Sequence, residues 1–599
     1  MKYTTDNREV TIDLNRDELL PEASMQVLKD KYLIGDEKSP QEAFARASCA
    51  YSDNSSHAQR LYDYASKQWF MFATPVLSNA GSTRGLPISC FLNFTEDSIG
   101  GLAKNFEEDM WMSVKGGGIG TYFGAVRSIG TPTNSGNKTT GAIAFMKNID
   151  SLMLSCHQGS TRRGSCAMYM DVSHPEIEEF IIMRKPSGGD YNRKNLNLHH
   201  GINLTDEFMH AVLNNEDYNL IDPHTRGIKK TVKARDIWRE ILTARIETGE
   251  PYLHFVDTSN RMLPKALKDK GLKIHGSNLC SEIFLPTTPD RTAVCCLSSV
   301  NAAKYNEWKN NTDFVSDLMR MLDNVLQVFI DNAPPELWRA VNSAKSERSV
   351  GLGMMGFHSF LQQSGIPFES PMALSWSENI IKNIYQKALQ ANFDLAEERG
   401  EAPDMEGTGR RFAHMLAVAP NASSGIICGT VSPSIEPYNS NAYNQKTSSG
   451  DFLIKNKELK KVLRDKYDKD TRRIWDSIIA NDGSVQHLKF MDDSDKAVFK
   501  TAHEIHQGFI VEHAARRQPF ICQGQSVNVF FDSNVDISYI NRVHFDAWAK
   551  GLKALYYCRS KSIQRAENVS GNTEENKPQQ QNEPTQSELP QDECLMCQG

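Results

Sequence analysis

The stretch Gly276–Pro286, Gly-Ser-Asn-Leu-Cys-Ser-Glu-Ile-Phe-Leu-Pro, carries an amide, a thiol and a carboxylate at alternate positions. On an extended backbone, Asn278, Cys280 and Glu282 would point to one side. The apolar residues 283–285 that follow predict that this side is buried, where such groups are costly unless they serve chemistry. We interpret Glu282 as a candidate general base and Cys280 as a candidate nucleophile or radical centre. The alternative is a loop that is polar at alternate positions by chance.

Two further cysteine sites could share a pocket with Cys280. Cys90 follows an apolar stretch that begins at Trp69 and is interrupted by turn residues, a setting typical of a small core residue. Cys295 and Cys296 are adjacent, and adjacent residues on an extended backbone face opposite sides. Only one of these two thiols can therefore lie beside Cys280, and the pattern leaves the choice open.

Several glycine-rich or hydroxyl-rich loops have compositions suited to an anionic ligand. Lys115–Gly120 is a glycine run that allows a backbone to approach a ligand closely, but its spacing differs from that of a dinucleotide-binding loop. Segments 124–141 and 158–164, rich in Gly, Ser, Thr and Arg, are either surface loops or anion-contacting loops. Apolar residues 416–419 lead into Pro420–Gly425, which predicts either a phosphate seat or an ordinary helix N-cap.

Composition limits the class of protein. The 599 residues are 39% hydrophobic and 24% charged, enough for a large core and more than one average domain. A formal net charge of -7 argues against binding a nucleic-acid polymer. With no apolar run of about 18 residues and no leader, we expect a cytoplasmic protein without membrane contact. Twelve cysteines in 599 residues are too few for a disulfide-stabilised scaffold. Any cysteines that pair should therefore be catalytic, redox-active or metal-bound.

The apolar pattern divides the chain into three parts. Residues 1–60 are predicted to be a helical region and residues 61–568 one large α/β catalytic domain. Residues 569–599 are rich in Gln, Asn, Glu, Pro and Ser, which predicts a disordered tail. Its Cys594 and Cys597 favour redox exchange over half of a zinc site, because no second Cys/His pair lies nearby.

Six short motifs are spread over the chain. Each would be weak evidence alone, and on pattern alone the tyrosine pair of the fifth would be core residues. Together, and in this order, they resemble the large catalytic subunit of class I ribonucleotide reductase over most of residues 60–565 and the tail. The motifs are Ala73–Gly81 with Pro87–Cys90, Ser277–Glu282, Val294–Leu297, Pro420–Ser424, Leu555–Tyr557 and Glu593–Cys597.

The resemblance implies a ten-stranded α/β barrel whose central finger loop carries the radical residue, Cys280. That thiol would become a thiyl radical and remove the ribose 3′ hydrogen, while Glu282 would act as base for the 3′-hydroxyl and Asn278 would hold it. Cys90 and Cys295 would reduce the 2′ position and end as a disulfide, so they must be neighbours in space. The family register favours Cys295 over its neighbour, although a cysteine at the next position replaces the expected Asn or Thr.

The resemblance also implies a ribonucleoside diphosphate substrate, an allosteric dNTP or ATP, and no tightly bound cofactor or metal in this chain. The effector would bind Asp97, Arg127 and Arg163 across a homodimer contact. The expected substrate-binding residues are Thr74, Ser89, Cys90, Gly118, Asn278, Glu282, Pro420, Asn421, Ala422, Ser423 and Ser424.

Protein partners follow from the same resemblance. A metal-containing small subunit would supply the radical, which Tyr556 and Tyr557 would relay. Cys594 and Cys597 would reduce the active-site disulfide and be reset by thioredoxin or glutaredoxin. Because Thr74 is preceded by 73 residues without the opening of an ATP-cone, we expect dATP not to switch off overall activity.

Three alternatives remain open. An adenosylcobalamin-dependent reductase shares the cysteine chemistry but needs no radical from a partner, and the pair Tyr556-Tyr557 argues against it. The second is a catalytically silent nucleotide-binding regulator built on the same barrel, and the presence of every reactive residue argues against it. The third is an α/β protein whose two tail cysteines bind zinc.

Overall fold

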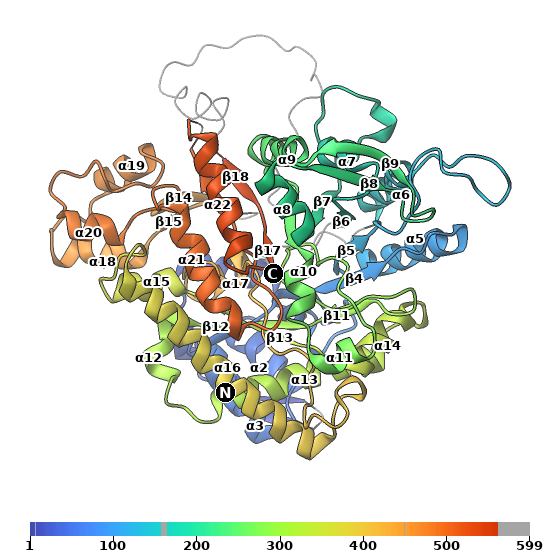
Figure 1. Ribbon diagram of the computed structural model, residues 1–599. Helices are drawn as coiled ribbons and strands as arrows, with labels where there is room; N and C mark the ends of the chain where they lie inside the picture. The colour runs from blue at the N-terminus through green and yellow to red at the C-terminus, as the bar shows by residue number, and fades with distance from the viewer. Residues whose placement is uncertain (6, 157–163, 448–449, 533, 561–599) are drawn as a thin grey trace, which may run out of the picture.

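The β-strands lie at the centre of the computed structural model and are surrounded by helices (Figure 1). The structure describes residues 1–5, 7–156, 164–447, 450–532 and 534–560. Residues 569–599, predicted to be a disordered tail with the redox cysteines Cys594 and Cys597, lie outside the described residues.

Five parallel strands make the first half of a ring. They are hydrogen-bonded in the order β4-β5-β6-β7-β10, and nearly all their residues are buried, as expected for parallel strands covered on both faces. Their bounds are β4 Cys90–Phe94, β5 Gly118–Tyr122, β6 Cys166–Asp171, β7 His199–Leu204 and β10 Tyr252–Phe255. The crossover helices are α5 Ile99–Val114, α6 Ala142–Ser155, α7 Ile177–Ile182, α8 Asp206–Asn214 and α9 Ala234–Thr248, with a hairpin β8 Asp217–Ile221 and β9 Ile228–Lys233.

The second half also contains five parallel segments. β12 pairs with β13, Leu352 bridges Leu416, Val418 bridges Gln525, and β16 pairs with β18. The segments are β11–β12, β13, residues 414–418, residues 523–531 with β16, and residues 554–560 with β17 and β18. The bounds are β11 Ala293–Cys295, β12 Leu297–Asn301, β13 Gly351–Met355, β16 Val529–Phe531, β17 Ala554–Leu555 and β18 Cys558–Ser560.

Two antiparallel seams close the ring. β11 runs antiparallel to β4, and β17 runs antiparallel to β10. The described part of the chain therefore forms two five-stranded parallel halves, and the ten-stranded α/β barrel expected from the resemblance is confirmed. A short strand, β3 (Phe70–Phe72), adds to the outside of the second half by pairing with β12.

Helices cover the second half on its outer side. The helix α13 spans Phe314–Asn332. The others are α10 Val256–Arg261, α11 Lys265–Asp269, α12 Tyr305–Trp308, α14 Trp338–Glu347, α15 Phe357–Gln363, α16 Pro371–Arg399, α17 Ala422–Ile427, α21 Gln507–Arg517 and α22 Ile537–Ala549. A separate apolar core around Trp475 holds β14 Ala442–Thr447, β15 Gly450–Lys455, α18 Lys457–Asp465, α19 Arg472–Ala480 and α20 Asp493–Val498.

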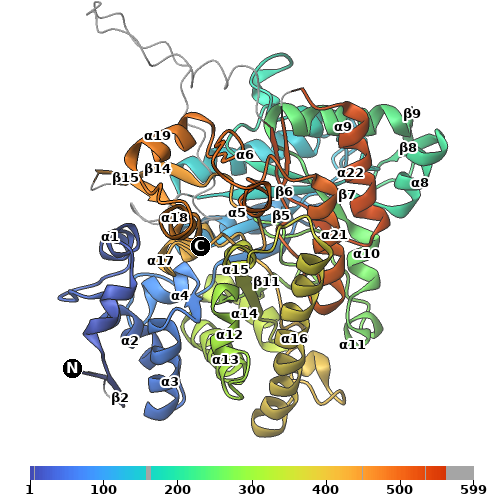
Figure 2. The ribbon, with the colours of Figure 1, turned by 90° about the vertical axis from the view of Figure 1, so that its left-hand side faces the viewer.

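The N-terminal region lies on one side of the barrel (Figure 2). It contains helices, as predicted, but opens with a hairpin of two short strands that the helical prediction missed. Their alternation of polar and β-branched residues suits a half-exposed pair. The elements are β1 Lys2–Thr5, β2 Arg8–Thr11, α1 Glu22–Lys31, α2 Pro40–Ala50, α3 Ser55–Ser66 and α4 Thr74–Asn79.

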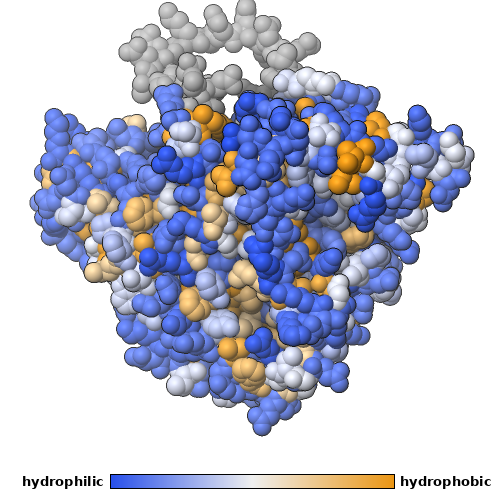
Figure 3. Space-filling view, in the orientation of Figure 1, coloured by the Kyte–Doolittle hydropathy of each residue, from blue (hydrophilic) through white to orange (hydrophobic). Residues whose placement is uncertain are grey.

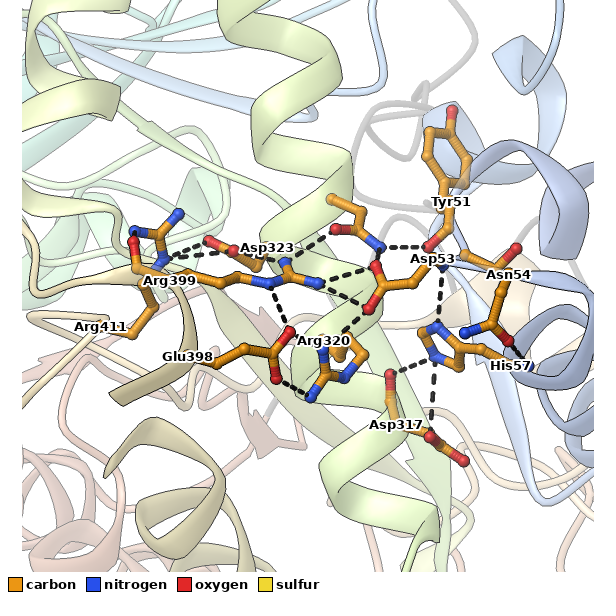
Figure 4. Close-up of polar contacts among 12 residues, drawn as sticks. Tyr51, Asp53, Asn54, His57, Asp317, Arg320, Asp323, Glu398, Arg399 and Arg411 are labelled. Atoms are coloured by element: carbon orange, nitrogen blue, oxygen red, sulfur yellow. Dashed lines mark hydrogen bonds and ion pairs between the residues drawn. The ribbon is translucent and has the colours of Figure 1, made fainter. Parts of the chain in front are cut away.

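An ion-pair network joins this region to the barrel helices (Figure 4). Asp53, just before α3, accepts hydrogen bonds from Arg320 of α13 at 2.8 Å and from Arg399 of α16 at 2.7 Å. Arg399 also contacts Asp323 of α13 at 2.7 Å. Although burial raises the pKa of Asp53, hydrogen bonds from Asn324 and Arg320 and the charge of Arg399 lower it to about 2. The carboxylate is therefore charged at neutral pH and fixes the N-terminal helices against α13 and α16.

The face of the molecule in Figure 3 is predominantly hydrophilic. Among the helices of the described ranges, none is both long enough and apolar enough to cross a bilayer.

Candidate active site

The loop 276–286 passes through the centre of the barrel and contacts both halves. A Cβ on Gly120 of β5 would lie 1.8 Å from the Ser277 carbonyl oxygen, so only glycine allows this approach. Tyr169 of β6 donates its hydroxyl to the Asn278 carbonyl at 2.8 Å, and Ser526 donates to the Cys280 carbonyl at 2.5 Å. The glycine run therefore makes room for the finger loop, whereas the sequence had suggested that it makes room for a ligand.

The finger loop turns sharply and is not extended. Ser281 has a φ of 61°, and the Asn278 side-chain oxygen accepts hydrogen bonds from the backbone amides of Glu282 and Ile283, both at 3.1 Å. The extended-backbone premise of the sequence argument is therefore wrong. The turn nevertheless brings the predicted amide and carboxylate together, with Asn278 Nδ2 donating to Glu282 Oε1 at 2.9 Å.

Cys90 adjoins this amide–carboxylate pair. Its Sγ accepts a hydrogen bond from Asn278 Nδ2 at 3.2 Å and donates to Glu282 Oε1 at 3.8 Å. The Glu282 side chain is almost completely buried, and burial raises its pKa to about 7, against hydrogen bonds from Asn278, Ser526 and Cys90 that lower it. Glu282 can therefore hold or release a proton near neutral pH.

Cys295 lies directly opposite Cys90 where β11 meets β4. Opposed residues of an antiparallel pair share a face and have Cα atoms about 4.5–5.5 Å apart, within the range a disulfide needs. Burial raises the pKa of the Cys295 thiol well above its usual value. Cys296 points the other way, with its Sγ 3.4 Å from the Leu322 carbonyl of α13. The structure thus places Cys295, and not its neighbour, beside Cys90.

Cys280 packs in a buried aromatic cluster with Tyr169, Tyr252 and Tyr556. The rings of Tyr556 and Tyr557 have centroids 4.3 Å apart. Helix α22 ends at Ala549, and the two tyrosines follow in the extended segment between β17 and β18. Tyr556 is buried beside Cys280 of the finger loop, and Tyr557, the next residue, is half-buried.

The proposed phosphate seat forms a strand-to-helix junction. Asn421 has a φ of 54°, makes no side-chain cap, and precedes α17, whose first turn holds Ala422, Ser423 and Ser424. The Ser424 and Ser89 hydroxyls are buried and have no hydrogen-bond partner within the described ranges. Orphaned buried hydroxyls of this kind are suited to a polar ligand.

Three other predicted binding residues have protein contacts or flanking positions. Thr74 shares a 2.9 Å hydrogen bond with the Tyr32 hydroxyl. Gly118 packs against the finger loop, where a Cβ would lie 3.3 Å from Leu279 Cδ2. Pro420 directly precedes the Asn421 turn.

The predicted effector residues are only partly located. Asp97 pairs with Arg127 at 2.9 Å and with His224 at 3.0 Å. His224 was not predicted, because it lies in the β8–β9 loop, far from the other two in sequence. Arg163, like Cys594 and Cys597, lies outside the described residues.

Two polar residues of the site were also missed. Gln523 donates to Cys295 Sγ at 3.5 Å, and the Ser526 hydroxyl, which donates to the Cys280 carbonyl, also lies 3.1 Å from Glu282 Oε2. They belong to Gln523-Gly-Gln-Ser526, where a glycine among polar residues was the only available signal.

The fold and site define an α/β-barrel oxidoreductase with two opposed thiols beside a central cysteine loop. Comparison with known proteins agrees. The family model of the ribonucleotide reductase barrel domain matches residues 88–409 and 403–558, and that of the all-alpha domain matches residues 18–85. The chain therefore belongs to the ribonucleotide reductase family, as a large catalytic subunit.

Individual relatives are similar over nearly the whole chain. The "Ribonucleoside-diphosphate reductase large subunit" of Invertebrate iridescent virus 3 is 43% identical over 98% of this chain and 100% of its own length. A putative large subunit of Frog virus 3 is 48% identical over 90% of this chain and 92% of its own. A solved structure, the Actinobacillus ureae class Id ribonucleotide reductase alpha subunit, has a TM-score of 0.81 and 34% identity. The match covers 92% of this chain and 99% of that subunit.

Proposed function

We propose that this chain reduces ribonucleoside diphosphates to 2′-deoxyribonucleoside diphosphates, the substrate class named for its relatives. One observation carries the assignment of roles: Cys90 faces Cys295 across β4 and β11, and Asn278 Nδ2 contacts both Cys90 Sγ and Glu282 Oε1. A pair of reducing thiols, a carboxylate base and an amide donor thus meet in one buried pocket. That set is what removal of a ribose hydroxyl requires.

In the proposed reaction, a thiyl radical on Cys280 removes the 3′ hydrogen and returns it at the end. Glu282, with a pKa of about 7, takes the 3′-hydroxyl proton, and Asn278 orients that hydroxyl. The 2′ oxygen leaves as water with a proton from Cys90. Two thiols are oxidised to the Cys90–Cys295 disulfide as one C–O bond is replaced by C–H, so electrons balance.

Partners and ligands are assigned from the family. A metal-containing small subunit supplies the radical, and Tyr557 and Tyr556, with ring centroids 4.3 Å apart, carry it to Cys280. The substrate diphosphate binds at Asn421–Ser424, and a dNTP or ATP effector binds at Asp97 and Arg127 across a homodimer. The tail cysteines restore the active-site thiols.

The direct test is turnover of the four ribonucleoside diphosphates by the purified chain, with and without a small radical-generating subunit. Product only when both chains are present is expected. Turnover with adenosylcobalamin and no second subunit would favour the cobalamin-dependent alternative.

Glu282→Gln is expected to lower kcat by about 10²–10⁴-fold, because the amide cannot accept the 3′-hydroxyl proton. Since burial raises the pKa of Glu282 to about 7, the basic form accumulates above neutrality, and wild-type kcat should rise from pH 6 to pH 8. Glu504→Gln is the control, since that half-buried carboxylate accepts hydrogen bonds from Ser484 and Thr501 in the segment between α19 and α21. A Glu282→Gln enzyme with wild-type kcat would remove this residue from the mechanism.

Replacing both Cys594 and Cys597 by Ser is expected to stop turnover with thioredoxin but to leave one round of reduction intact, because Cys90 and Cys295 start as thiols. Dithiothreitol at roughly the millimolar effective concentration of the tethered dithiol should restore part of the rate. Cys156→Ser, a half-buried thiol at the end of α6, is the control. A first round without product in rapid-quench experiments would show that the tail has a binding or structural role.

A further inference from the structure

The Tyr557 hydroxyl lies against a cluster of ionisable side chains that the relay proposal leaves without a role. Tyr557 Oη is 3.3 Å from His199 Nδ1. The same nitrogen is 2.6 Å from Glu250 Oε1 and 3.2 Å from Arg184 Nη1. Arg184 also forms an ion pair with Glu250. A phenol, an imidazole and a carboxylate are therefore in contact around one nitrogen atom.

Sheet topology fixes this arrangement. His199 is the first residue of β7, and Glu250 lies two residues before β10, its neighbour in the sheet. β10 pairs in turn with β17, which ends one residue before Tyr556. The Gly249 carbonyl accepts a hydrogen bond from the Cys558 amide at 2.9 Å, which holds the Tyr557 segment against the cluster.

The charge of Glu250 is maintained although the side chain is 1% exposed. Burial raises its pKa, but the charge of Arg184 and hydrogen bonds from His199 and His200 lower the pKa well below its usual range. The backbone amide and Nδ1 of His200 lie 3.1 and 3.2 Å from Glu250 Oε2. A carboxylate thus faces His199 at neutral pH.

His199 Nδ1 is placed so that either protonation state has a partner. An arginine N–H only donates, so the Arg184 contact requires a lone pair on Nδ1. A carboxylate oxygen only accepts, so the Glu250 contact requires a proton there. With its proton on Nε2, the neutral ring accepts a hydrogen bond from Arg184 at Nδ1, and the ring protonated at both nitrogens donates from Nδ1 to Glu250.

Tyr557 has a physical need for such a partner. Oxidation of a phenol that keeps its proton leaves a positive charge on the ring. The Arg559 guanidinium already lies 5.3 Å from the centre of the Tyr557 ring, and a second positive charge beside it in a half-buried site is unfavourable. Loss of the proton together with the electron avoids that charge.

We propose that His199, held by Glu250, accepts the phenolic proton of Tyr557 during radical transfer. Tyr557 gives one electron to the radical of the small subunit and its hydroxyl proton to His199 Nδ1. The products are a neutral tyrosyl radical and an imidazolium paired with the Glu250 carboxylate. The proton returns when Tyr557 is reduced again. This inference rests on the proposed relay function of Tyr557.

The test is His199→Gln in the full-length chain, assayed with its small subunit. Glutamine keeps a polar side chain but cannot take a proton, so kcat should fall at least about tenfold with KM unchanged. Glu250→Gln removes the charge that stabilises the imidazolium and should give a smaller fall. The controls are His210→Gln, an exposed histidine of α8, and Glu247→Gln, a surface carboxylate of α9 paired with Lys185.

A fluorinated tyrosine at position 557 separates proton acceptance from a structural role. Above the pKa of such a phenol the ring has already lost its proton, so His199→Gln should no longer lower kcat in that background. A persistent loss there, or wild-type kcat for His199→Gln with the natural tyrosine, would overturn the proposal. Tyr557→Phe separates failure of the relay from failure of the proton acceptor, because activity in that variant would refute the relay role of Tyr557 itself.

Discussion

Cys280→Ser is expected to abolish turnover, a loss on the order of 10⁴-fold or more, while nucleotide binding survives. Serine fits the volume of the thiol, which packs among Tyr169, Tyr252 and Tyr556, so the fold should be retained. Its O–H bond is much stronger than the S–H bond, so the relay cannot form an oxygen radical there. Steady-state deoxynucleotide formation, with equilibrium nucleotide binding alongside, measures both effects.

Cys296→Ser is the matched control for this prediction. Cys296 is as buried as Cys280, but its Sγ contacts the Leu322 carbonyl on the far side of the strand. A serine hydroxyl can donate to the same carbonyl, so activity should stay close to wild type. Activity of Cys280→Ser within a few-fold of wild type would rule out the thiyl mechanism.

Tyr556→Phe and Tyr557→Phe should each reduce turnover to background without unfolding the protein. Each change removes only a hydroxyl, and the two rings, 4.3 Å apart, still pack. Turnover with the small subunit, together with the thermal midpoint Tm, gives the readout. Tyr218→Phe, a buried tyrosine that packs on Phe208 at 5.1 Å, should leave turnover unchanged.

The opposite pattern would support the core-packing interpretation of the tyrosine pair. In that case the two variants would lower the Tm while the folded fraction kept its activity. Loss of turnover with an unchanged Tm is the pattern that the radical relay predicts.

The residue types of the site were predictable because local motifs carry them. The motif of the finger loop supplied its amide, thiol and carboxylate. The resemblance supplied the ring of ten strands, which periodicity alone does not reveal. The roles of the individual residues stay predictions until the variants are measured.

What the residue patterns alone could not predict depends on contacts between distant segments. The resemblance implied that Cys90 and Cys295 are neighbours, and their opposition in the structure is a consequence of strand register, which is fixed by the whole sheet. The turn at Ser281 depends on the side-chain oxygen of Asn278, which accepts from the two amides that follow it. Ser526 reaches the finger loop from a segment 244 residues away from Glu282. Contacts of this kind leave no spacing signature.

Single-turnover chemistry is the strongest test of whether Cys90 and Cys295 reduce the substrate. The pre-reduced enzyme, with the small subunit, an effector nucleotide and a ribonucleoside diphosphate but no external reductant, should be quenched and analysed for product and for disulfides by mass spectrometry. In the enzyme whose tail cysteines are both replaced by serine, we expect a first round of deoxynucleotide with one Cys90–Cys295 disulfide formed per product. Product without that disulfide, or a disulfide through Cys296, would contradict that role of the two cysteines.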